Sequence, residues 1–525
     1  MKKKLVCILT AGIGSRMGKL SDELNKALFV FKDKAIISHI IENFSSASTE
    51  YIVGLGHKGK QVKKFLELAH PDRSFKFVKI NPYIGKGSGP GFSLLKCKKY
   101  LNRPFYFIPC DAFLNQKIPS TQKYNWIALG SEKVIDNKNY CNMEVSKKRI
   151  TQIFDKIKCN GENIYQFTGL CFIKDTEIFW SGLRNKKLVN NEIQISNGFN
   201  HLLKKSKNIS SKFIKWYDLG DYNKYKETNR KYQKYDFSKN NEVIYIYKKK
   251  IIKFFTDTKI VKQKILKIKN KNKLFPKIIG VKEQFFAYEF FHGRTLYQNN
   301  SILIFTKFLN FMHNNFWQEK FLLSKKAFIE NCKKFYFNKT INRYKKFKLK
   351  YKNYDELKKV NNKSYFSIKK ILKNISWTEI NDGKQYYIHG DLQFDNILYN
   401  QKKQKFILID WRQNFGGSIY TGDLHYDLAK MYGGILIDYF QIKKNRFSFN
   451  EDNKNINFTI PRIKNYKNYV HSLNNYVIKN SLNMKKIRIL TGIIFLNMAP
   501  LHTYPFDKIL FNYARKILHE EIFNK

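Results

Sequence analysis

Short apolar runs recur along the first part of the chain. They are Lys4–Leu9, Tyr51–Leu55, Phe75–Ile80 and Phe105–Ile108. Runs of this length that end at turn-forming residues are typical of buried strands. Their succession predicts an alternating α/β fold for this part of the protein.

The pattern changes in the second part of the chain. Asn241–Tyr247 and Ile251–Phe255 predict two strands of a hairpin. Ser301–Lys373 is predicted to be helical, and so is most of the segment after Asp427. An apolar stripe recurs there at helical spacing, and core packing explains it: Phe305, Phe308, Leu309 and Met312.

A chain of 525 residues is too long for one hydrophobic core, so two or three domains are expected. Tyr222–Asn240 is rich in Lys, Tyr and Asn and has no clear amphipathic period. We place the junction there, near residue 235, and predict domains at 1–235 and 236–525.

The composition favours a cytoplasmic protein. No run reaches the roughly 18 apolar residues of a membrane span, and Ile487–Pro500 is too short. The start of the chain imitates a signal peptide, but its apolar run stops at Gly12-Ile13-Gly14 without a cleavage pattern. The 7 Cys form no CxxC pair, which fits a reduced compartment. We therefore expect no membrane insertion.

A net charge of +57 would ordinarily suggest a nucleic acid or an anionic membrane as partner. The Lys residues are scattered, however, and they accompany much Asn, Ile, Tyr and Phe, all encoded by A/T-rich codons. Genome composition is a sufficient cause. We expect no nucleic-acid partner, and a surface that incidentally favours anionic substrates.

The clearest chemical signal lies in Tyr387–Arg412. His389-Gly390-Asp391-Leu392 is followed by Asn396 and then by an apolar strand that ends in Asp410. Phosphoryl transfer needs a carboxylate to orient the attacking hydroxyl, and oxygen ligands that hold Mg²⁺ on the nucleotide phosphates. Asp391 suits the first role, and Asn396 and Asp410 suit the second. The alternative is an ordinary hairpin with polar turns, which would leave the kinase-like spacing of His389, Asp391, Asn396 and Asp410 unexplained.

The residues HGDLQFDNIL and LIDW resemble the aminoglycoside phosphotransferase and choline kinase superfamily. The resemblance implies a bilobal, protein-kinase-like α+β domain with an N-lobe at about 236–296 and a C-lobe at about 297–525. It also implies ATP as the phosphate donor and structural support of the catalytic loop by Asp427. Lys253 stands where these kinases keep a phosphate-binding Lys. Its usual acidic partner is missing or lies elsewhere, because 258–282 contains no Asp or Glu.

The N-terminal part carries a second signal. The strand Lys4–Leu9 feeds a turn that contains Gly12 and Gly14, where backbone N–H groups can surround a triphosphate. Arg16 and Lys26 can neutralise phosphates. A carboxylate at a strand end, here Asp111, is where an α/β fold holds Mg²⁺. An ordinary strand–helix turn would explain the glycines alone about as well.

Gly12-Ile13-Gly14-Ser15-Arg16 and Asn25-Lys26-Ala27-Leu28 resemble the GxGxR and PKAL signatures of the nucleotidyltransferase superfamily, with Asn25 in place of Pro. The resemblance implies a Rossmann-like domain, a mixed sheet flanked by helices, that transfers a nucleoside monophosphate to a phosphorylated acceptor. It implies these roles: Arg16 and Lys26 in catalysis; Ala11, Gly12, Gly14, Ser15, Gly87 and Ser88 in nucleotide binding; Asp111 and Asp218 as metal ligands; Lys156 on the acceptor phosphate. A flexible surface loop is the alternative for the segment around Gly87.

Together the two resemblances predict a bifunctional enzyme. A kinase phosphorylates a small hydroxyl-bearing acceptor with ATP, and a nucleotidyltransferase couples the product to a second NTP, with CTP expected first. The product would be a CDP-choline-like compound or an NDP-sugar for surface polysaccharide or lipid. The alternative is that only one half is active and the other is a pseudoenzyme or a regulatory binding module.

Overall fold

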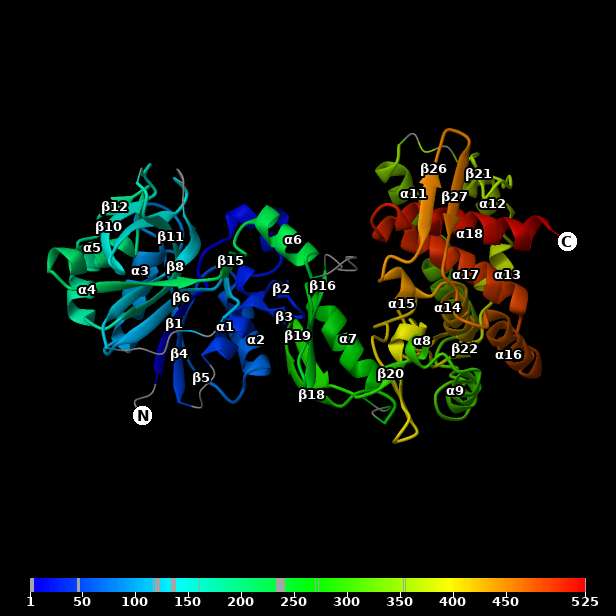
Figure 1. The fold of residues 1–525 in the computed structure, drawn as a ribbon. Helices are drawn as coiled ribbons and strands as arrows, with labels where there is room; N and C mark the ends of the chain where they lie inside the picture. The colour runs from blue at the N-terminus through cyan, green and yellow to red at the C-terminus, as the bar shows by residue number, and fades with distance from the viewer. Residues whose placement is uncertain are drawn as a thin grey trace. The chain divides into compact units, whose positions relative to one another are not determined.

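The structure is a computed structural model that describes residues 4–44, 48–116, 118, 123–133, 138–159, 161–232, 241–269, 271, 273–352, 354 and 356–524. It divides into two compact units (Figure 1). The first comprises Met1–Gln233, Asn240–Thr256 and Gly280–Ala287, and the second comprises Lys234–Lys239, Asp257–Ile279 and Tyr288–Lys525. The expected junction near residue 235 lies outside the described residues.

A mixed sheet forms the centre of the first unit. Among the described residues it has nine strands, in the order β5 (Ser74–Lys79), β4 (Thr49–Leu55), β1 (Lys4–Leu9), β6 (Phe105–Pro109), β11 (Ile164–Ile173), β8 (Asn125–Lys133), β14 (Ile209–Ile214), β10 (Arg149–Asp155) and β9 (Cys141–Ser146). The first four are parallel, and β11 joins β6 antiparallel. Each apolar run expected to be a strand in this part is confirmed as one.

Alternation along β1 explains why helices cover both faces of this sheet. Val6 and Ile8 face α1 (Ile36–Asn43) and α2 (Gly59–Ala69). Leu5, Cys7 and Leu9 face the opposite core, built by α3 (Pro90–Cys97), α4 (Thr176–Arg184) and α5 (Ser196–Lys204). A strand buried on both faces is a continuous apolar run rather than an alternating one, as KLVCIL is. The expected mixed sheet flanked by helices is therefore present.

A second, four-stranded sheet has the order β16 (Glu242–Ile246), β17 (Lys250–Phe255), β19 (Phe285–Glu289) and β18 (Ile278–Lys282). β16 and β17 form the antiparallel hairpin expected from the sequence. Tyr245 is fully buried, and its hydroxyl donates to the Leu28 carbonyl at 2.8 Å. The Tyr247 and Ser38 hydroxyls are hydrogen-bonded at 2.7 Å.

These contacts place β16 and β17 in the first compact unit, whereas the predicted boundary near residue 235 puts them in the second domain. The reason is their aromatic face, which packs on the α1 and α2 side of the first core. Helix α6 (Tyr222–Arg230) precedes them, begun by an Asp221 side chain that accepts from two backbone N–H groups. The domain limits themselves stay a prediction.

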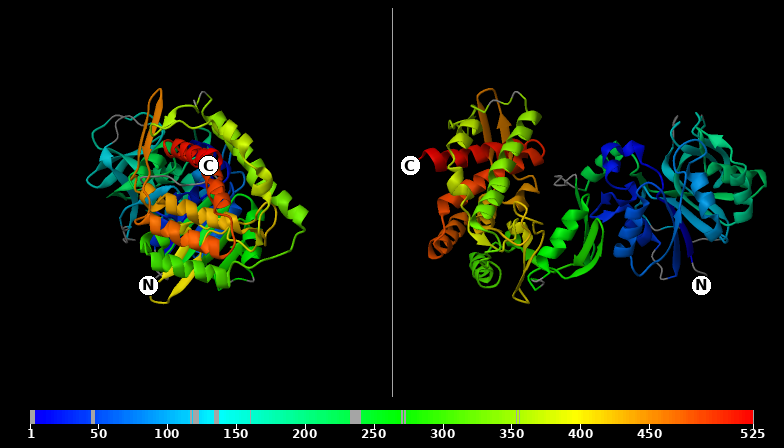
Figure 2. Two further views of the ribbon diagram at one scale, coloured as in Figure 1. Left: turned by 90° about the vertical axis from the view of Figure 1, so that its right-hand side faces the viewer. Right: turned by 180° about the vertical axis from the view of Figure 1, so that it is seen from behind.

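The second unit is mainly helical (Figure 2). Its longest helices are α9 (Ile302–Asn315), α11 (Lys339–Lys350), α14 (Leu424–Leu436), α16 (Tyr466–Lys479), α17 (Met484–Met498) and α18 (Phe506–Phe523). Buried residues extend along most of α14 and α17, and the predicted stripe on α9 is buried. A hairpin of β26 (Ser448–Glu451) and β27 (Asn455–Thr459) interrupts the helices. Another hairpin, β23 (Ile397–Asn400) and β24 (Lys405–Leu408), carries the candidate kinase motif.

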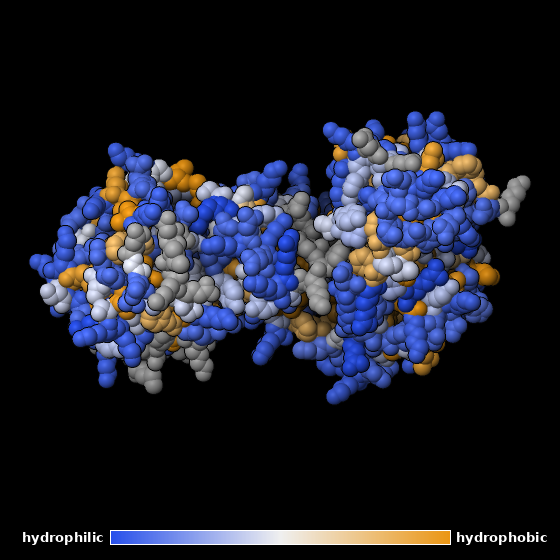
Figure 3. Space-filling view, turned by 45° about the horizontal axis from the view of Figure 1, so that its top comes forward, coloured by the Kyte–Doolittle hydropathy of each residue, from blue (hydrophilic) through white to orange (hydrophobic). Residues whose placement is uncertain are grey.

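The surface is strongly polar on the face shown in Figure 3, where apolar side chains gather only in small groups. Within the described part of the chain, no helix is both long enough and apolar enough to cross a bilayer. The Lys excess is therefore carried on solvated surface, apart from a small number of buried Lys residues described below.

We expect Tyr245→Ala to loosen the first unit as well as the hairpin. The change removes a buried ring that packs 4.7 Å from Phe65 of α2, centre to centre, at a cost of about 3–5 kcal/mol. Hydrogen–deuterium exchange should rise in α1 and α2. Ile244→Ala, on the more exposed face of the same strand, should leave both helices unchanged. Faster exchange restricted to β16 and β17 would contradict the packing argument.

Candidate active sites

The glycine-rich turn after β1 is fastened to the neighbouring strand β4. Thr10 donates to the Gly54 carbonyl through its backbone N–H at 2.9 Å and its hydroxyl at 2.8 Å. The His57 N–H donates to the Ala11 carbonyl at 2.9 Å. Gly14 has a φ of 75°, in the left-handed region that favours glycine. Its Cα lies against Lys26, because a Cβ there would be 3.4 Å from the Lys26 Cδ.

The remaining predicted residues of this turn lie where a nucleotide can reach them. Gly12, Ser15 and Arg16 are exposed, and Ser15 begins the short 3₁₀ helix η1 (Ser15–Asp22). The turn therefore presents exposed backbone and one cation next to Lys26.

Asn25, where the resembled signature has Pro, is fully buried. Its side-chain amide donates to the Thr10 carbonyl at 3.0 Å and to the His57 carbonyl at 2.6 Å, and its oxygen accepts from the Ala27 N–H at 2.9 Å. Hydrogen bonds of Asn25 thus restrict the loop in place of the proline ring of the resembled signature. They also fix the position of the next residue, Lys26, against the glycine-rich turn.

Lys26 and Asp111 form an ion pair, with Nζ and Oδ2 2.7 Å apart and both side chains largely buried. Burial alone would raise the pKa of Asp111, but Lys26, with its hydrogen bond and a contribution from Arg16, lowers that pKa below its ordinary value. Burial alone would lower the pKa of Lys26, and Asp111 raises it instead. Both groups are therefore charged at neutral pH.

Asp218 lies beside Asp111, as the sequence hypothesis requires. β7 (Ala112–Leu114) pairs with β15 (Trp216–Asp218) so that Ala112 is opposite Asp218. Gly220 separates the two carboxylates, because a Cβ on it would be 2.4 Å from the Asp111 Oδ2 and 3.2 Å from the Asp218 Oδ1. The Tyr140 hydroxyl donates to the Asp218 Oδ2 at 2.6 Å.

This donor set fits a hard divalent cation. Mg²⁺ is commonly held by one or two carboxylates together with substrate phosphate oxygens. Asp111 and Asp218 supply two such groups on either side of the space that Gly220 leaves open. In the described part of the chain no group of three or more His, Cys, Asp or Glu side chains could hold a metal. Substrate oxygens would have to complete the coordination.

The other three residues predicted for this site contact the hairpin of β12 (Leu188–Val189) and β13 (Glu192–Ile193). The Gly87 N–H donates to the Asn191 carbonyl at 2.8 Å, and the Ile193 N–H to the Ser88 carbonyl at 2.7 Å. Ser88 is buried, and its hydroxyl donates to the Gly85 carbonyl. Lys156 Nζ is 3.1 Å from the Glu192 Oε2. The structure thus joins Gly87, Ser88 and Lys156 through one hairpin.

In the second unit Asp427 supports the predicted catalytic loop. Its Oδ2 accepts from the His389 N–H and its Oδ1 from the Gly390 N–H, both at 2.7 Å. The Trp317 indole N–H also donates to it, at 3.2 Å. Burial raises the pKa of Asp427 in spite of these donors. Asp427 therefore supports the loop, as the sequence analysis expected.

His389 ties this loop to the end of β24. Its Nδ1 accepts from the Asp391 N–H at 3.2 Å, so its Nε2 carries the hydrogen and donates to the Ile409 carbonyl at 3.0 Å. Burial lowers the pKa of His389 to about 3, with Lys267 adding to the effect. The ring is neutral at physiological pH and acts as a fixed brace.

Asn396 and Asp410 are brought together by the hairpin. The Ile409 N–H donates to the Asn396 carbonyl at 2.9 Å, and the Asn396 amide donates to the Asp391 carbonyl at 2.8 Å. The amide nitrogen is thus engaged, and its oxygen is the atom that can ligate a cation. Asp410 has a φ of 58°, a strained conformation for a non-glycine residue and one that occurs at functional sites.

Lys253 does have an acidic partner, which sequence reasoning did not find. Its Nζ is 3.0 Å from the Glu242 Oε1, and both side chains are buried. Glu242 precedes Lys253 on the neighbouring strand β16 rather than following it on a helix. Cross-strand register cannot be deduced from the segment after Lys253, which is why the partner was missed. The phosphate-binding role of Lys253 stays a prediction.

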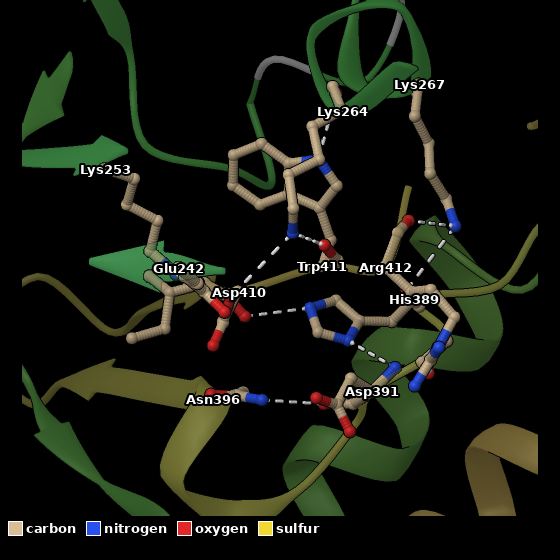
Figure 4. Close-up of polar contacts among 12 residues, drawn as sticks. Glu242, Lys253, Lys264, Lys267, His389, Asp391, Asn396, Asp410, Trp411 and Arg412 are labelled. Atoms are coloured by element: carbon tan, nitrogen blue, oxygen red, sulfur yellow. Dashed lines mark hydrogen bonds and ion pairs between the residues drawn. The ribbon is translucent and has the colours of Figure 1, made fainter. Parts of the chain in front are cut away.

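Two buried Lys residues of α7 (Thr258–Ile268) were also missed. Lys264 donates to the Trp411 carbonyl, and its Nζ is 3.8 Å from the Asp410 Oδ1. Lys267 donates to the Arg412 carbonyl at 2.9 Å, and burial lowers its pKa. They position the residues that follow β24 (Figure 4). In a chain with 98 Lys and Arg, no sequence signal distinguishes them.

A comparison with known protein families finds a match within the first unit. Residues 6–119 match a family model described as a MobA-like NTP transferase domain. The N-terminal part of the chain carries an NTP transferase domain. The match includes the glycine-rich turn, Lys26 and Asp111, and it lies wholly within the first compact unit. No curated protein matches the chain.

Solved structures are similar to a somewhat larger share of the chain, 43–45% of it. A UDP-glucose pyrophosphorylase complexed with UDP-glucose is 20% identical, with 44% of this chain and 98% of that chain covered and a TM-score of 0.38. A putative glucose-1-phosphate thymidylyltransferase from Bacillus anthracis is 19% identical, with coverage of 45% and 98% and a TM-score of 0.37. A CTP:phosphocholine cytidylyltransferase from Streptococcus pneumoniae is 18% identical, with coverage of 43% and 98% and a TM-score of 0.36.

We expect Gly220→Ala to reduce nucleotidyl transfer by about 100-fold, because its Cβ would displace the carboxylates of Asp111 and Asp218. Transfer would be followed as pyrophosphate release with each of the four NTPs and a panel of phosphorylated acceptors. Lys215→Ala, an exposed change in the same segment, should behave as wild type. An unchanged rate in Gly220→Ala would show that the two carboxylates do not act together.

The buried His389 should make the second unit sensitive to mild acid. Its pKa is about 3 when folded and about 6.5 when unfolded, so the unfolded state binds more protons between these values and stability falls as the pH drops. When the pH is lowered from about 7 to about 5, the free energy of unfolding of wild type should fall by about 2 kcal/mol more than that of His389→Asn.

The free energy of unfolding would be obtained from amide hydrogen exchange in β23 and β24, measured at increasing urea concentration and corrected for the intrinsic exchange rates at each pH. The exposed His471 provides a matched control, and His471→Asn should keep the wild-type pH dependence. A parallel acid loss in wild type and His389→Asn would contradict the interpretation.

Proposed function

We propose that this chain is a bifunctional enzyme that phosphorylates a small hydroxyl-bearing acceptor with ATP and then transfers a nucleoside monophosphate to the product. The observation that carries the proposal is that each unit assembles its own acidic site beside a cation. In the first unit Lys26 pairs with Asp111, and Asp218 lies across Gly220. In the second unit Asp391 stands on a loop fixed by Asp427.

In the nucleotidyl transfer, the turn at Gly12 and Gly14 would receive the triphosphate of the NTP, with CTP expected first. Arg16 and Lys26 would neutralise its phosphates, and the exposed backbone around Gly87 would contact the base. Bound Mg²⁺ would be held by Asp111 and Asp218 and would stabilise the negative charge of the leaving pyrophosphate. Lys156 would orient the acceptor phosphate, whose oxygen attacks the α-phosphorus directly.

In the kinase reaction, Asp391 would orient the acceptor hydroxyl and accept its proton as the oxygen attacks the γ-phosphorus of ATP. Asn396 and Asp410 supply the oxygen donors that fit Mg²⁺ on the nucleotide phosphates. The hydrogen bond from Asn396 to the Asp391 carbonyl fixes the proton acceptor relative to one metal ligand. ADP is released with the γ-phosphoryl group transferred.

The alternative in which the second unit is a pseudoenzyme or regulatory module has less support. Loss of catalysis removes the selection that keeps Asp391, Asn396 and Asp410, and here all three are present and braced by hydrogen bonds. Lys253, whose acidic partner could not be identified in the sequence, is paired with Glu242.

The two reactions should be separable by mutation. Asp391→Asn should abolish phosphorylation of the acceptor and leave nucleotidyl transfer to a supplied phosphorylated acceptor intact, whereas Lys26→Ala should do the converse. A product screen by mass spectrometry would supply Mg²⁺, ATP, the common NTPs and a panel of choline, ethanolamine, glycerol, amino acids and sugars. A new NDP-linked compound that requires both ATP and one acceptor is expected from wild type.

Each failure has a distinct meaning in that screen. Loss of both activities in either single variant would contradict independent sites. A phosphorylated acceptor without a nucleotide product would restrict the proposal to the kinase. No consumption of any NTP would overturn the proposal in favour of a binding module.

A further inference from the structure

Cations surround the proposed proton acceptor of the second unit. Lys430 of α14 is buried, and its Nζ is 2.8 Å from the Asp391 Oδ1. Arg412 donates through Nε to the Gly390 carbonyl, at 2.9 Å, so its guanidinium is fixed beside the residue that precedes Asp391.

Helix α11 adds two more cations to the same place. The Lys339 Nζ lies 4.2 Å from the centre of the Phe335 ring, and the Arg412 guanidinium carbon lies 5.2 Å from the same centre. Arg343 is four residues after Lys339, which places it on the same side of α11 one turn later. Lys339, Arg343, Arg412 and Lys430 are called the cation group below.

The protein neutralises the cation group only in part, because Lys430 pairs with Asp391 whereas Lys339 and Arg343 have no such pair among the described residues. Burial lowers the pKa of Lys339 well below its ordinary value, and Arg412, Lys430 and Arg343 lower it further. Burial and Arg412 lower the pKa of Arg343 as well. Among the described residues, no carboxylate is within ion-pair distance of Lys339 or Arg343. An unpaired, partly dehydrated cation is costly, and a bound anion would relieve that cost.

Lys430 and Lys339 of this group act on Asp391, and Arg412 acts on both Asp391 and Asp410. The carboxylate that acts on Lys339 is Asp391, whereas Asp410 is approached by Lys264 from α7. Asp391 is where the acceptor hydroxyl must lie, and Asn396 and Asp410 mark the side of the nucleotide phosphates. The excess positive charge is thus on the acceptor side.

We propose that the acceptor of the kinase half carries an anionic group, a carboxylate or a phosphate, which Lys339 and Arg343 bind while Asp391 receives the hydroxyl. The inference rests on the proposed kinase function and narrows its substrate class. It argues against choline and ethanolamine, whose positive charge the cation group would repel. The second step would then give a nucleotide-linked product that bears an additional negative charge.

The first test measures anion binding without requiring turnover. Full-length protein is saturated with Mg²⁺ and a non-hydrolysable ATP analogue, so that the γ-phosphate position is filled. Thermal unfolding is then followed with added inorganic phosphate, D-glycerate or choline, each against chloride at equal ionic strength. Phosphate or glycerate should raise the unfolding temperature of wild type, and choline should not. The stronger of the two anions distinguishes a phosphate from a carboxylate.

The matched variants are K339A/R343A and K345A/K346A, which remove two cations each from one helix. Lys345 and Lys346 are exposed, so their removal should preserve the response, whereas K339A/R343A should lose it. An equal anion response in all three proteins, or none beyond chloride in wild type, would overturn the proposal. The response is independent of phosphoryl transfer, so an inactive kinase with an intact response would refute the proposed function alone.

The second test shows whether the cation group binds the acceptor or the nucleotide. With glycerol, D-glycerate and glycerol 3-phosphate as acceptors, an anionic compound should be phosphorylated in preference to glycerol. K339A/R343A should raise the KM for that acceptor by about 10-fold or more and leave the KM for ATP unchanged. If only the KM for ATP rises, the proposal is wrong, and the cation group binds the triphosphate of ATP instead of the acceptor.

Discussion

Pairing of scarce carboxylates is the constraint on which both sites depend. The chain has 98 Lys and Arg against 41 Asp and Glu, and a carboxylate withdrawn from water must be matched by a cation or by N–H donors. Asp111 is matched by Lys26, Glu242 by Lys253, and Asp427 by two backbone N–H groups. Asp423 of the second unit is fully buried and engages His425 and Lys486. The contacts of Asp111 with Lys26, of Asp427 with the His389 loop and of Asp423 with Lys486 also join segments that are distant in sequence.

The two sites are built by different means to the same end. In the NTP transferase domain, strand ends bring the acidic groups together, and Asn25 and Thr10 fasten the turn that receives phosphates. In the second unit, a loop stands on Asp427 and is braced by His389. Both arrangements place a carboxylate at a fixed point before any ligand binds, which is what positional catalysis requires.

The environment of Asp391 changes the substrate expected from motif resemblance alone. A resemblance to choline kinases suggests a cationic acceptor, but Lys430 contacts Asp391 directly and Arg412 and Lys339 lie on the same ring nearby. In the proposed kinase reaction, the motif would supply the chemistry of phosphate transfer. The surrounding side chains, which are positively charged, would supply the specificity.

The sequence by itself predicted the strands of the first sheet, the buried stripe of α9 and the residues of both candidate sites. Apolar runs such as Lys4–Leu9 are strands because burial on both faces requires them to be apolar throughout, and motif spacing is local information. It could not determine which core a strand joins, so β16 and β17 were assigned to the second domain although Tyr245 and Tyr247 bury in the first unit. It also could not show which of many Lys residues are buried. Partners across strands and between helices, such as Glu242 for Lys253 or Lys430 for Asp391, arise only when the backbone has folded, because register and burial are long-range properties.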